Sequence, residues 1–240
     1  MKFEALASSS SGNAYIVSDR DTRILLECGI PHKKLQKLSG FSLSEFKACL
    51  VTHEHKDHAK SVQELINSGM DVYMSYGTAQ ALGCINLVKL IEHMEQFNIG
   101  SFDCVAFNVF HDTSEPLGFL IKSRVDGDIF AFATDTVNLR YKFPGLNILA
   151  IEANYSPEIL AKNEKMPEKV KHRIENTHMN IDVLCDYLST MDLSQCREIY
   201  LLHLSDSSSH EKKFISKVKN VIPPHINVTV CPKEAKSNAK

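Results

Sequence analysis

The stretch His53-Glu54-His55-Lys56-Asp57-His58 decides how the fold of this chain is interpreted. It follows the apolar run Ala48-Cys49-Leu50-Val51, which predicts a buried strand, and it precedes a helical pattern over residues 59–67. In a straight strand alternate residues share a face, which suits the first two histidines but sends the aspartate and the third histidine to opposite sides. A loop between a strand end and a helix start can instead turn two of these side chains toward one metal ion and two toward another.

The ligand chemistry of this loop indicates a metal site. Imidazole and carboxylate groups are ligands that zinc, manganese or iron accepts. The alternative is a polar loop that contains several histidines by chance. We favour the metal site because residues suited to complete a dinuclear centre follow later in the chain.

The length and composition of the chain predict one large domain. With 240 residues, of which 43% are hydrophobic, the chain can bury a substantial core. We assign the domain to residues 1–232 and a polar C-terminal tail to residues 233–240. The net charge of −2 neither indicates nor excludes a nucleic-acid partner.

The cysteines and the N-terminus bear on where the protein works. The seven cysteines are odd in number and form no CxxC pair, which is typical of reduced, buried thiols in the cytosol. The first residues include no apolar leader segment, and no run approaches membrane-spanning length. We therefore expect a cytoplasmic protein without a membrane partner, and no pattern indicates an oligomeric state.

Several predicted strands end in a residue that can bind metal. These strand-end residues are His53, His111, Asp135 and His203. Each alone is more often a structural residue, but α/β folds place their sites where strands end at one edge of a sheet. The four residues together with the histidine loop therefore indicate one site. Because strands first form a meander and then alternate with helices, we predict an α/β layered fold.

Local signals place two helices of the second half of the chain. A polar, lysine-bearing pattern predicts a helical stretch over roughly residues 157–174. Asn180 is suited to be the N-cap of another helix over residues 181–191.

The chain resembles the metallo-β-lactamase fold hydrolases, whose HxHxDH signature matches residues 53–58. Within that superfamily it is most similar to the YycJ (WalJ) subgroup of DNA exonuclease-type proteins. The stretches that carry this resemblance are Leu6-Ala7-Ser8-Ser9-Ser10-Ser11-Gly12-Asn13, His111-Asp112-Thr113-Ser114-Glu115-Pro116-Leu117-Gly118-Phe119, Thr134-Asp135-Thr136, Ile151-Glu152-Ala153-Asn154-Tyr155 and Leu202-His203-Leu204-Ser205. The resemblance covers nearly the whole chain and implies a four-layer αββα metallo-β-lactamase sandwich.

The resemblance also implies a cofactor of two divalent metal ions, zinc or manganese. The first ion would be held by His53, His55 and His111. The second would be held by Asp57, His58 and His203, and Asp135 would bridge the two.

Further candidate residues follow from the same resemblance. Asp57 and His178 are the candidate catalytic residues, and the alternative for His178 is a helix-terminal residue without a role. The candidates for substrate contact or for support of the site are Ser11, Asn13, Glu27 and Asn154. From composition alone the serine-rich loop around Ser11 is typical of an ordinary flexible loop. Glu27 stands where the family usually has aspartate, so the extra methylene should alter the support of the site rather than remove a ligand.

The charge of such a site favours an anionic substrate. Two divalent ions, reduced by Asp57, Asp135 and a bridging hydroxide, would keep about one positive charge to hold a phosphodiester, and the hydroxide would be the nucleophile. Lysine-rich segments at residues 162–173 and 212–219 could grip a nucleic-acid backbone, although such lysines are as often a solvated helix face.

Three functions compete on this sequence. The first is a metal-dependent phosphodiesterase or nuclease that acts on nucleic acid, with DNA exonuclease activity favoured by the subgroup. The second is a small-molecule hydrolase of the same fold, such as a cyclic nucleotide phosphodiesterase, a thioesterase or a lactonase. The third is a binding protein that has lost chemistry, which ranks last because all seven expected ligand positions are filled.

Overall fold

The computed structural model describes residues 1–235, so residues 236–240 of the predicted tail lie outside the described chain. Contacts divide the chain into two compact units. The first comprises residues Met1–Asn108, Thr113–Asp128 and the part that begins at Pro232, and the second comprises Val109–Asp112 and Ile129–Cys231. The assignment of residues 1–232 to one domain stays a prediction.

The first unit contains a six-stranded sheet whose strands follow chain order. They are β1 (Lys2–Ser9), β2 (Gly12–Ser18), β3 (Arg23–Leu26), β4 (Ala48–Leu50), β5 (Asp71–Met74) and β6 (Lys89–Leu90). Strands β1 to β3 are antiparallel, and β3 to β6 are parallel. Three further strands of this unit form an antiparallel meander: β7 (Gln96–Ile99), β8 (Phe102–Asn108) and β9 (Leu117–Ser123).

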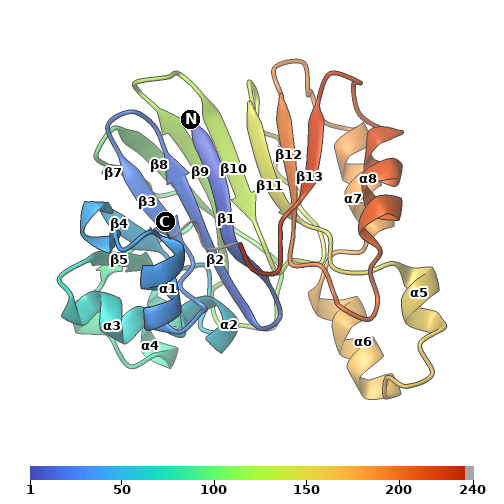
Figure 1. The fold of residues 1–240 in the computed structure, drawn as a ribbon, viewed down its shortest axis with the longest axis horizontal. Helices are drawn as coiled ribbons and strands as arrows, with labels where there is room; N and C mark the ends of the chain where they lie inside the picture. Colours follow the sequence, from blue (N-terminus) through green and yellow to red (C-terminus); the bar gives the residue numbers. More distant parts are fainter. Residues whose placement is uncertain (236–240) are drawn as a thin grey trace. The chain divides into compact units, whose positions relative to one another are not determined.

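The helices of the first unit are short and lie beside β3, β4 and β5 in Figure 1. They are α1 (His32–Leu38), α2 (Lys56–Ala59), α3 (Val62–Asn67) and α4 (Tyr76–Ala81), with single 3-10 turns at Leu43–Glu45 and Ile85–Leu87. Leu35 from α1 and Leu65 from α3 are fully buried in one core cluster with Cys49 of β4 and Met74 of β5. This packing fixes the start of the histidine loop, because β4 is buried on both sides.

The second unit contains four parallel strands, β10 (Ile129–Ala133), β11 (Ile148–Glu152), β12 (Glu198–Leu202) and β13 (Asn227–Val230). Its helices are α5 (Pro157–Ala161), α6 (Glu168–Thr177), α7 (Ile181–Ser189) and α8 (Glu211–Lys219). Helix α8 packs on α7 and on β13, as Figure 1 shows. Asn180 caps α7, since its side-chain oxygen accepts from the N–H groups of Asp182 and Val183, as the sequence predicts.

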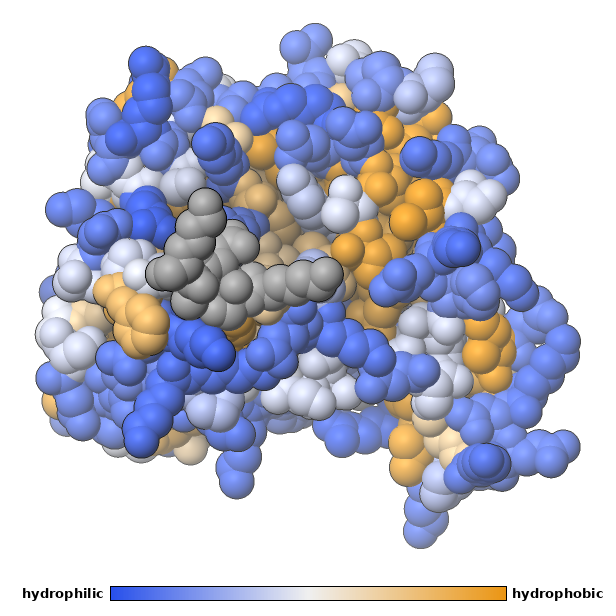
Figure 2. Space-filling model, in the orientation of Figure 1, coloured by the Kyte–Doolittle hydropathy of each residue, from blue (hydrophilic) through white to orange (hydrophobic). Residues whose placement is uncertain are grey.

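The stretch predicted as helical over residues 157–174 is interrupted. The structure has two helices there, α5 and α6, and Pro167 directly precedes the second one. Proline has no N–H to donate and its ring disfavours a helical residue before it, so it begins a helix instead of lying within one. In Figure 2 the surface over α5 and α6 is mostly hydrophilic, and Lys162, Lys165 and Lys169 are exposed.

The cysteines are unpaired and the described helices are short. All seven cysteines are free, and all but Cys185 are buried, as predicted for reduced thiols. The longest helix in the described part of the chain is α6 with ten residues, and no helix there is long and apolar enough to cross a bilayer.

Candidate metal centre

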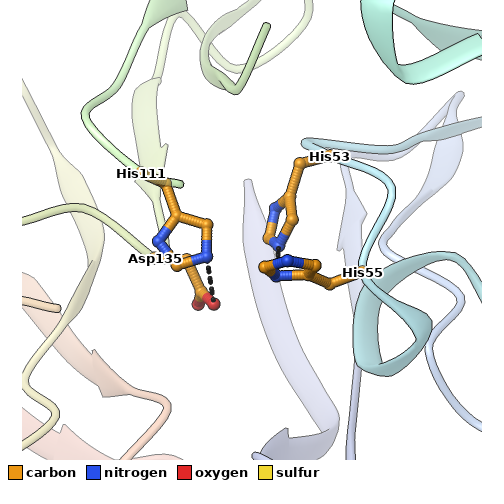
Figure 3. Close-up of side chains that lie close together, drawn as sticks. All are labelled: His53, His55, His111 and Asp135. Atoms are coloured by element: carbon orange, nitrogen blue, oxygen red, sulfur yellow. Dashed lines mark hydrogen bonds and ion pairs between the residues drawn. The ribbon is translucent and has the colours of Figure 1, made fainter. Parts of the chain in front are cut away.

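The histidine loop leaves strand β4 and becomes helix α2 within the motif itself, at Lys56. His53 and His58 are buried, whereas His55 and Asp57 are partly exposed. Nε2 of His53 lies 3.1 Å from Nδ1 of His55, a contact drawn as a dashed line in Figure 3. Two nitrogen ligands of a tetrahedral zinc ion, each about 2.0–2.1 Å from the metal, would be about 3.3 Å apart. This spacing therefore fits two ligands of one ion.

Asp57 and His58 form the second part of the loop. Oδ2 of Asp57 lies 3.4 Å from Nε2 of His58. Behind the ring, Oε2 of Glu27 lies 3.6 Å from Nδ1 of His58. Glu27 is fully buried at the end of β3 and also accepts the N–H of Thr52 at 3.3 Å. A carboxylate behind a histidine is the arrangement that orients metal-binding imidazoles, and a supporting role for Glu27 stays a prediction.

Asn13 of β2 and Gly29, which follows β3, lie directly against the loop. The Asn13 side-chain nitrogen lies 3.2 Å from the carbonyl oxygen of Asp57 and 3.2 Å from Nε2 of His58. A Cβ atom on Gly29 would lie 1.7 Å from the carbonyl oxygen of Asp57, so only glycine fits there. Asn13 therefore lies at the loop, whereas Ser11 is exposed and bonds Ser9 through its backbone N–H, which leaves a role for the Ser11 side chain a prediction.

The second unit gathers its own set of ligand-type residues at one edge of its sheet. Parallel pairing places Ala133 opposite Ile151 and Glu152 opposite Leu202, so Asp135, Glu152 and His203 emerge together. Ligand atoms of the following residues all lie within 4.8 Å of one another: Asp135, Glu152, His178 and His203.

Asp135 presents its two oxygens to two different histidines. Oδ2 lies 3.6 Å from Nε2 of His111, the pair shown in Figure 3. Oδ1 lies 3.5 Å from Nδ1 of His203. The buried carboxylate thus lies between two imidazole rings.

The backbone at three of these strand ends is strained. Among the described residues, five non-glycine residues have a positive φ, and Glu27, Asp135 and His203 are three of them, with φ of 65°, 44° and 53°. L-residues adopt this region at an energetic cost, and such strain gathers at functional sites.

His178 and Glu152 form a tight imidazole–carboxylate pair. Nδ1 of His178 lies 2.6 Å from Oε1 of Glu152, and Glu152 also accepts the N–H groups of Thr136 at 2.8 Å and Met179 at 3.0 Å. Burial opposes ionisation of Glu152, but the charge and hydrogen bond of His178 outweigh it, and the pKa of Glu152 is lowered. Burial likewise opposes the charged form of His178, but the charge of Glu152 outweighs it and the pKa of His178 is raised.

Asn154 fixes the position of His203. Its side-chain nitrogen donates to the carbonyl oxygen of His203 at 2.9 Å and lies 3.1 Å from Nδ1 of the same residue. Asn154 thus lies where a supporting residue was expected. Glu152 was not among the predicted site residues, although it ends strand β11 as other ligand-type residues end theirs. The strand-end pattern could have found it.

The donor sets of the two units suit divalent cations. The first unit offers His53, His55, Asp57 and His58, and the second offers His111, Asp135, Glu152 and His203. All are imidazole nitrogens or carboxylate oxygens, and the closest pairs have the spacing of ligands around an ion. The residues therefore fit the divalent metal cofactor that the sequence predicts.

Comparison with known proteins agrees with this chemistry. Residues 22–204 match the model of the beta-lactamase superfamily domain. Exodeoxyribonuclease WalJ of Streptococcus pneumoniae serotype 2 is 27% identical over 226 residues, which cover 87% of this chain and 83% of the relative. Exodeoxyribonuclease YycJ of Bacillus anthracis is 27% identical over 223 residues, which cover 85% of this chain and 83% of the relative.

A solved structure shares the fold over nearly its whole length. The metallo-beta-lactamase fold protein YhfI of Bacillus subtilis superposes with a TM-score of 0.72 at 16% identity, covering 97% of both chains. This likeness confirms the α/β metallo-β-lactamase fold predicted from the sequence.

Proposed function

The chain belongs to the beta-lactamase superfamily domain family and is a metal-dependent hydrolase, and on that premise we propose that it hydrolyses phosphodiester bonds of DNA from the ends. The observation that carries the proposal is the buried carboxylate of Asp135 between two histidines, in a chain whose relatives are named exodeoxyribonucleases. A carboxylate whose two oxygens lie near two different histidines suits a centre of two cations. Such centres act on phosphodiesters by stabilising both the attacking and the leaving oxygen.

The proposed ligand assignment follows the order of the family motif. We assign His53, His55 and His111 to the first cation. We assign Asp57, His58 and His203 to the second cation and Asp135 to the bridge. When bound, the cations would supply an activated water and neutralise the phosphate charge.

His178 is the proposed proton donor to the leaving oxygen. Its Nδ1 is tied to Glu152 at 2.6 Å, so the ring can hold a proton that its other nitrogen delivers. Glu152 stays ionised because it accepts two backbone N–H groups as well, and it therefore positions His178 and raises the affinity of the ring for a proton.

The supporting residues have distinct proposed roles. Glu27 orients the ring of His58, and Asn154 orients His203. Asn13 holds the backbone of Asp57, the residue whose carboxylate we propose to bind the second cation. These contacts keep the ligand atoms in place before substrate binds.

The proposal is tested by a nuclease assay on metal-stripped protein with added manganese or zinc. End-labelled linear DNA and closed circular DNA of the same sequence are compared, with His55→Ala as the control variant. We expect the linear DNA to be shortened only with metal, while the circular DNA persists. Cleavage of neither form, together with metal-dependent hydrolysis of bis(p-nitrophenyl) phosphate, would assign the site to small phosphodiesters instead.

A further inference from the structure

An exposed aromatic ring precedes one of the proposed metal ligands in the second unit. Phe110 comes directly before His111 and is 37% exposed. The guanidinium carbon of Arg140 lies over its ring, 4.5 Å from the centroid. We call this pair the Phe110–Arg140 stack. A single exposed aromatic ring is ordinary on a protein surface. This one carries a guanidinium on its face and adjoins a proposed metal ligand.

The backbone fixes the stack to the segment that follows Asp135. The N–H of Phe110 donates to Oγ1 of Thr136 at 3.0 Å, and the N–H of Val137 donates to the carbonyl oxygen of Phe110 at 3.1 Å. Thr136 is in turn bonded through its N–H to Glu152 at 2.8 Å. The ring is therefore held by the same residues that position Asp135 and Glu152.

The guanidinium of Arg140 has no carboxylate partner among the described residues. Within residues 1–235 it forms no ion pair with a carboxylate, unlike Arg173, whose Nε lies 3.0 Å from Oδ2 of Asp112. Guanidinium groups stack on planar ring systems and bind phosphates in a forked geometry. A cation on an aromatic ring without an acidic partner is thus suited to a ligand that is both planar and anionic.

We propose that the Phe110–Arg140 stack binds an unpaired nucleobase at the end of the DNA strand and, through the guanidinium, its adjoining phosphate. The inference rests on the proposed nuclease function and deepens it by naming the part of the substrate that is recognised. A nucleobase that stacks on the pair adds a further layer to the stack. Base–aromatic stacking tolerates every base because each has a flat face. The enzyme therefore prefers single-stranded or frayed ends to blunt ones.

The test measures binding of two phosphorothioate oligonucleotides, which resist hydrolysis, to the metal-loaded full-length protein. One is a normal single strand and the other lacks the bases at both terminal nucleotides, with an internal dye for fluorescence anisotropy. We expect the wild type to bind the normal strand about five- to a hundredfold more tightly, from the measured strength of base–aromatic stacking. Phe110→Leu and Arg140→Ala should each remove most of that preference, and Phe110→Tyr should retain it.

Lys142→Ala is the matched control. It removes the same charge two residues further on, where the lysine lies 5.0 Å from the ring of the largely buried Tyr187. We expect it to affect both oligonucleotides equally. The inference is overturned if Phe110→Leu and Arg140→Ala weaken the binding of both oligonucleotides equally, or if both variants keep the wild-type preference. Either result would leave the proposed nuclease function standing. Failure of the wild type to bind or cleave any DNA would overturn the proposed function and the inference with it.

Discussion

Nδ1 of His178 lies 2.6 Å from Oε1 of Glu152, a carboxylate that is wholly buried at the end of strand β11. A buried carboxylate with three hydrogen-bond donors remains ionised and holds the neighbouring imidazole in one orientation. The pair therefore links the sheet edge of the second unit to a side chain that can give up a proton.

We expect Glu152→Gln to lower the rate of DNA hydrolysis by about a hundredfold, the scale of general-acid catalysis. The pKa of His178 is raised by the charge of Glu152 against the effect of burial, so removing that charge lowers it. Activity that needs protonated His178 falls as pH rises through this pKa. The alkaline limb of the pH–rate profile should therefore move to lower pH in the variant.

The same profile measured on His178→Ala serves as the control. That variant should be slow at every pH and should lack the alkaline limb that depends on His178. An alkaline limb at the same pH in Glu152→Gln and wild type would contradict the role given to the pair.

Gly29→Ala should unfold the first unit or weaken it severely. The new Cβ would lie 1.7 Å from the carbonyl oxygen of Asp57, and backbone atoms have little freedom to yield. We expect the free energy of unfolding, measured in urea, to fall by about 3 kcal/mol or more, the upper range of overpacking. Gly127→Ala is the comparison, since its Cβ would meet nothing within 4 Å and only its φ of +75° costs about 1–2 kcal/mol. Equal losses in the two variants would show that the close approach at Gly29 is absent.

Asp19 makes the stability of the first unit depend on pH. Its carboxylate accepts the hydroxyls of Ser101 and Ser123 at 2.6 Å each, and these bonds outweigh partial burial to lower its pKa. Because the pKa in the folded state lies below the unfolded value of about 3.9, the stabilisation is present above that pH and is lost as pH falls through the folded pKa.

Asp19→Asn should cost about 1 kcal/mol at pH 7, a low value for charged hydrogen bonds because Asp19 is partly exposed. The difference from wild type should shrink as pH falls below about 4. Urea unfolding at several pH values measures both effects. Asp21→Asn, at an exposed neighbouring position, should change little. A loss in Asp19→Asn that is the same at pH 3 and pH 7 would contradict the assignment.

Hydrophobic periodicity and residue type are enough to predict the strands that lead into the candidate site. The strands that end near His53, Asp135 and His203 could be predicted because apolar runs and ligand-type residues alternate along the chain. The left-handed backbone of Asp135 and His203 could not, since it is imposed by the packing around the strand ends and not by local preference.

Two further features were missed for different reasons. The break between α5 and α6 followed from Pro167, a local signal that the lysine pattern obscured. The role of Glu152 depends on residues distant in sequence, because its partners Thr136 and Met179 reach it only after β10 and β11 have paired. The strand-end pattern could have marked Glu152 as a candidate, but its contacts with these partners are set by tertiary structure and are not visible in a single sequence.

The measurement that tests the central claim most directly combines metal content with DNA hydrolysis in wild type and Asp135→Ala. After dialysis against limiting manganese or zinc, we expect the wild type to retain two ions per chain and to shorten linear DNA. Asp135→Ala, without the carboxylate that lies between His111 and His203, should retain at most one ion and should not shorten DNA. Two retained ions and full DNA hydrolysis in Asp135→Ala would contradict the account.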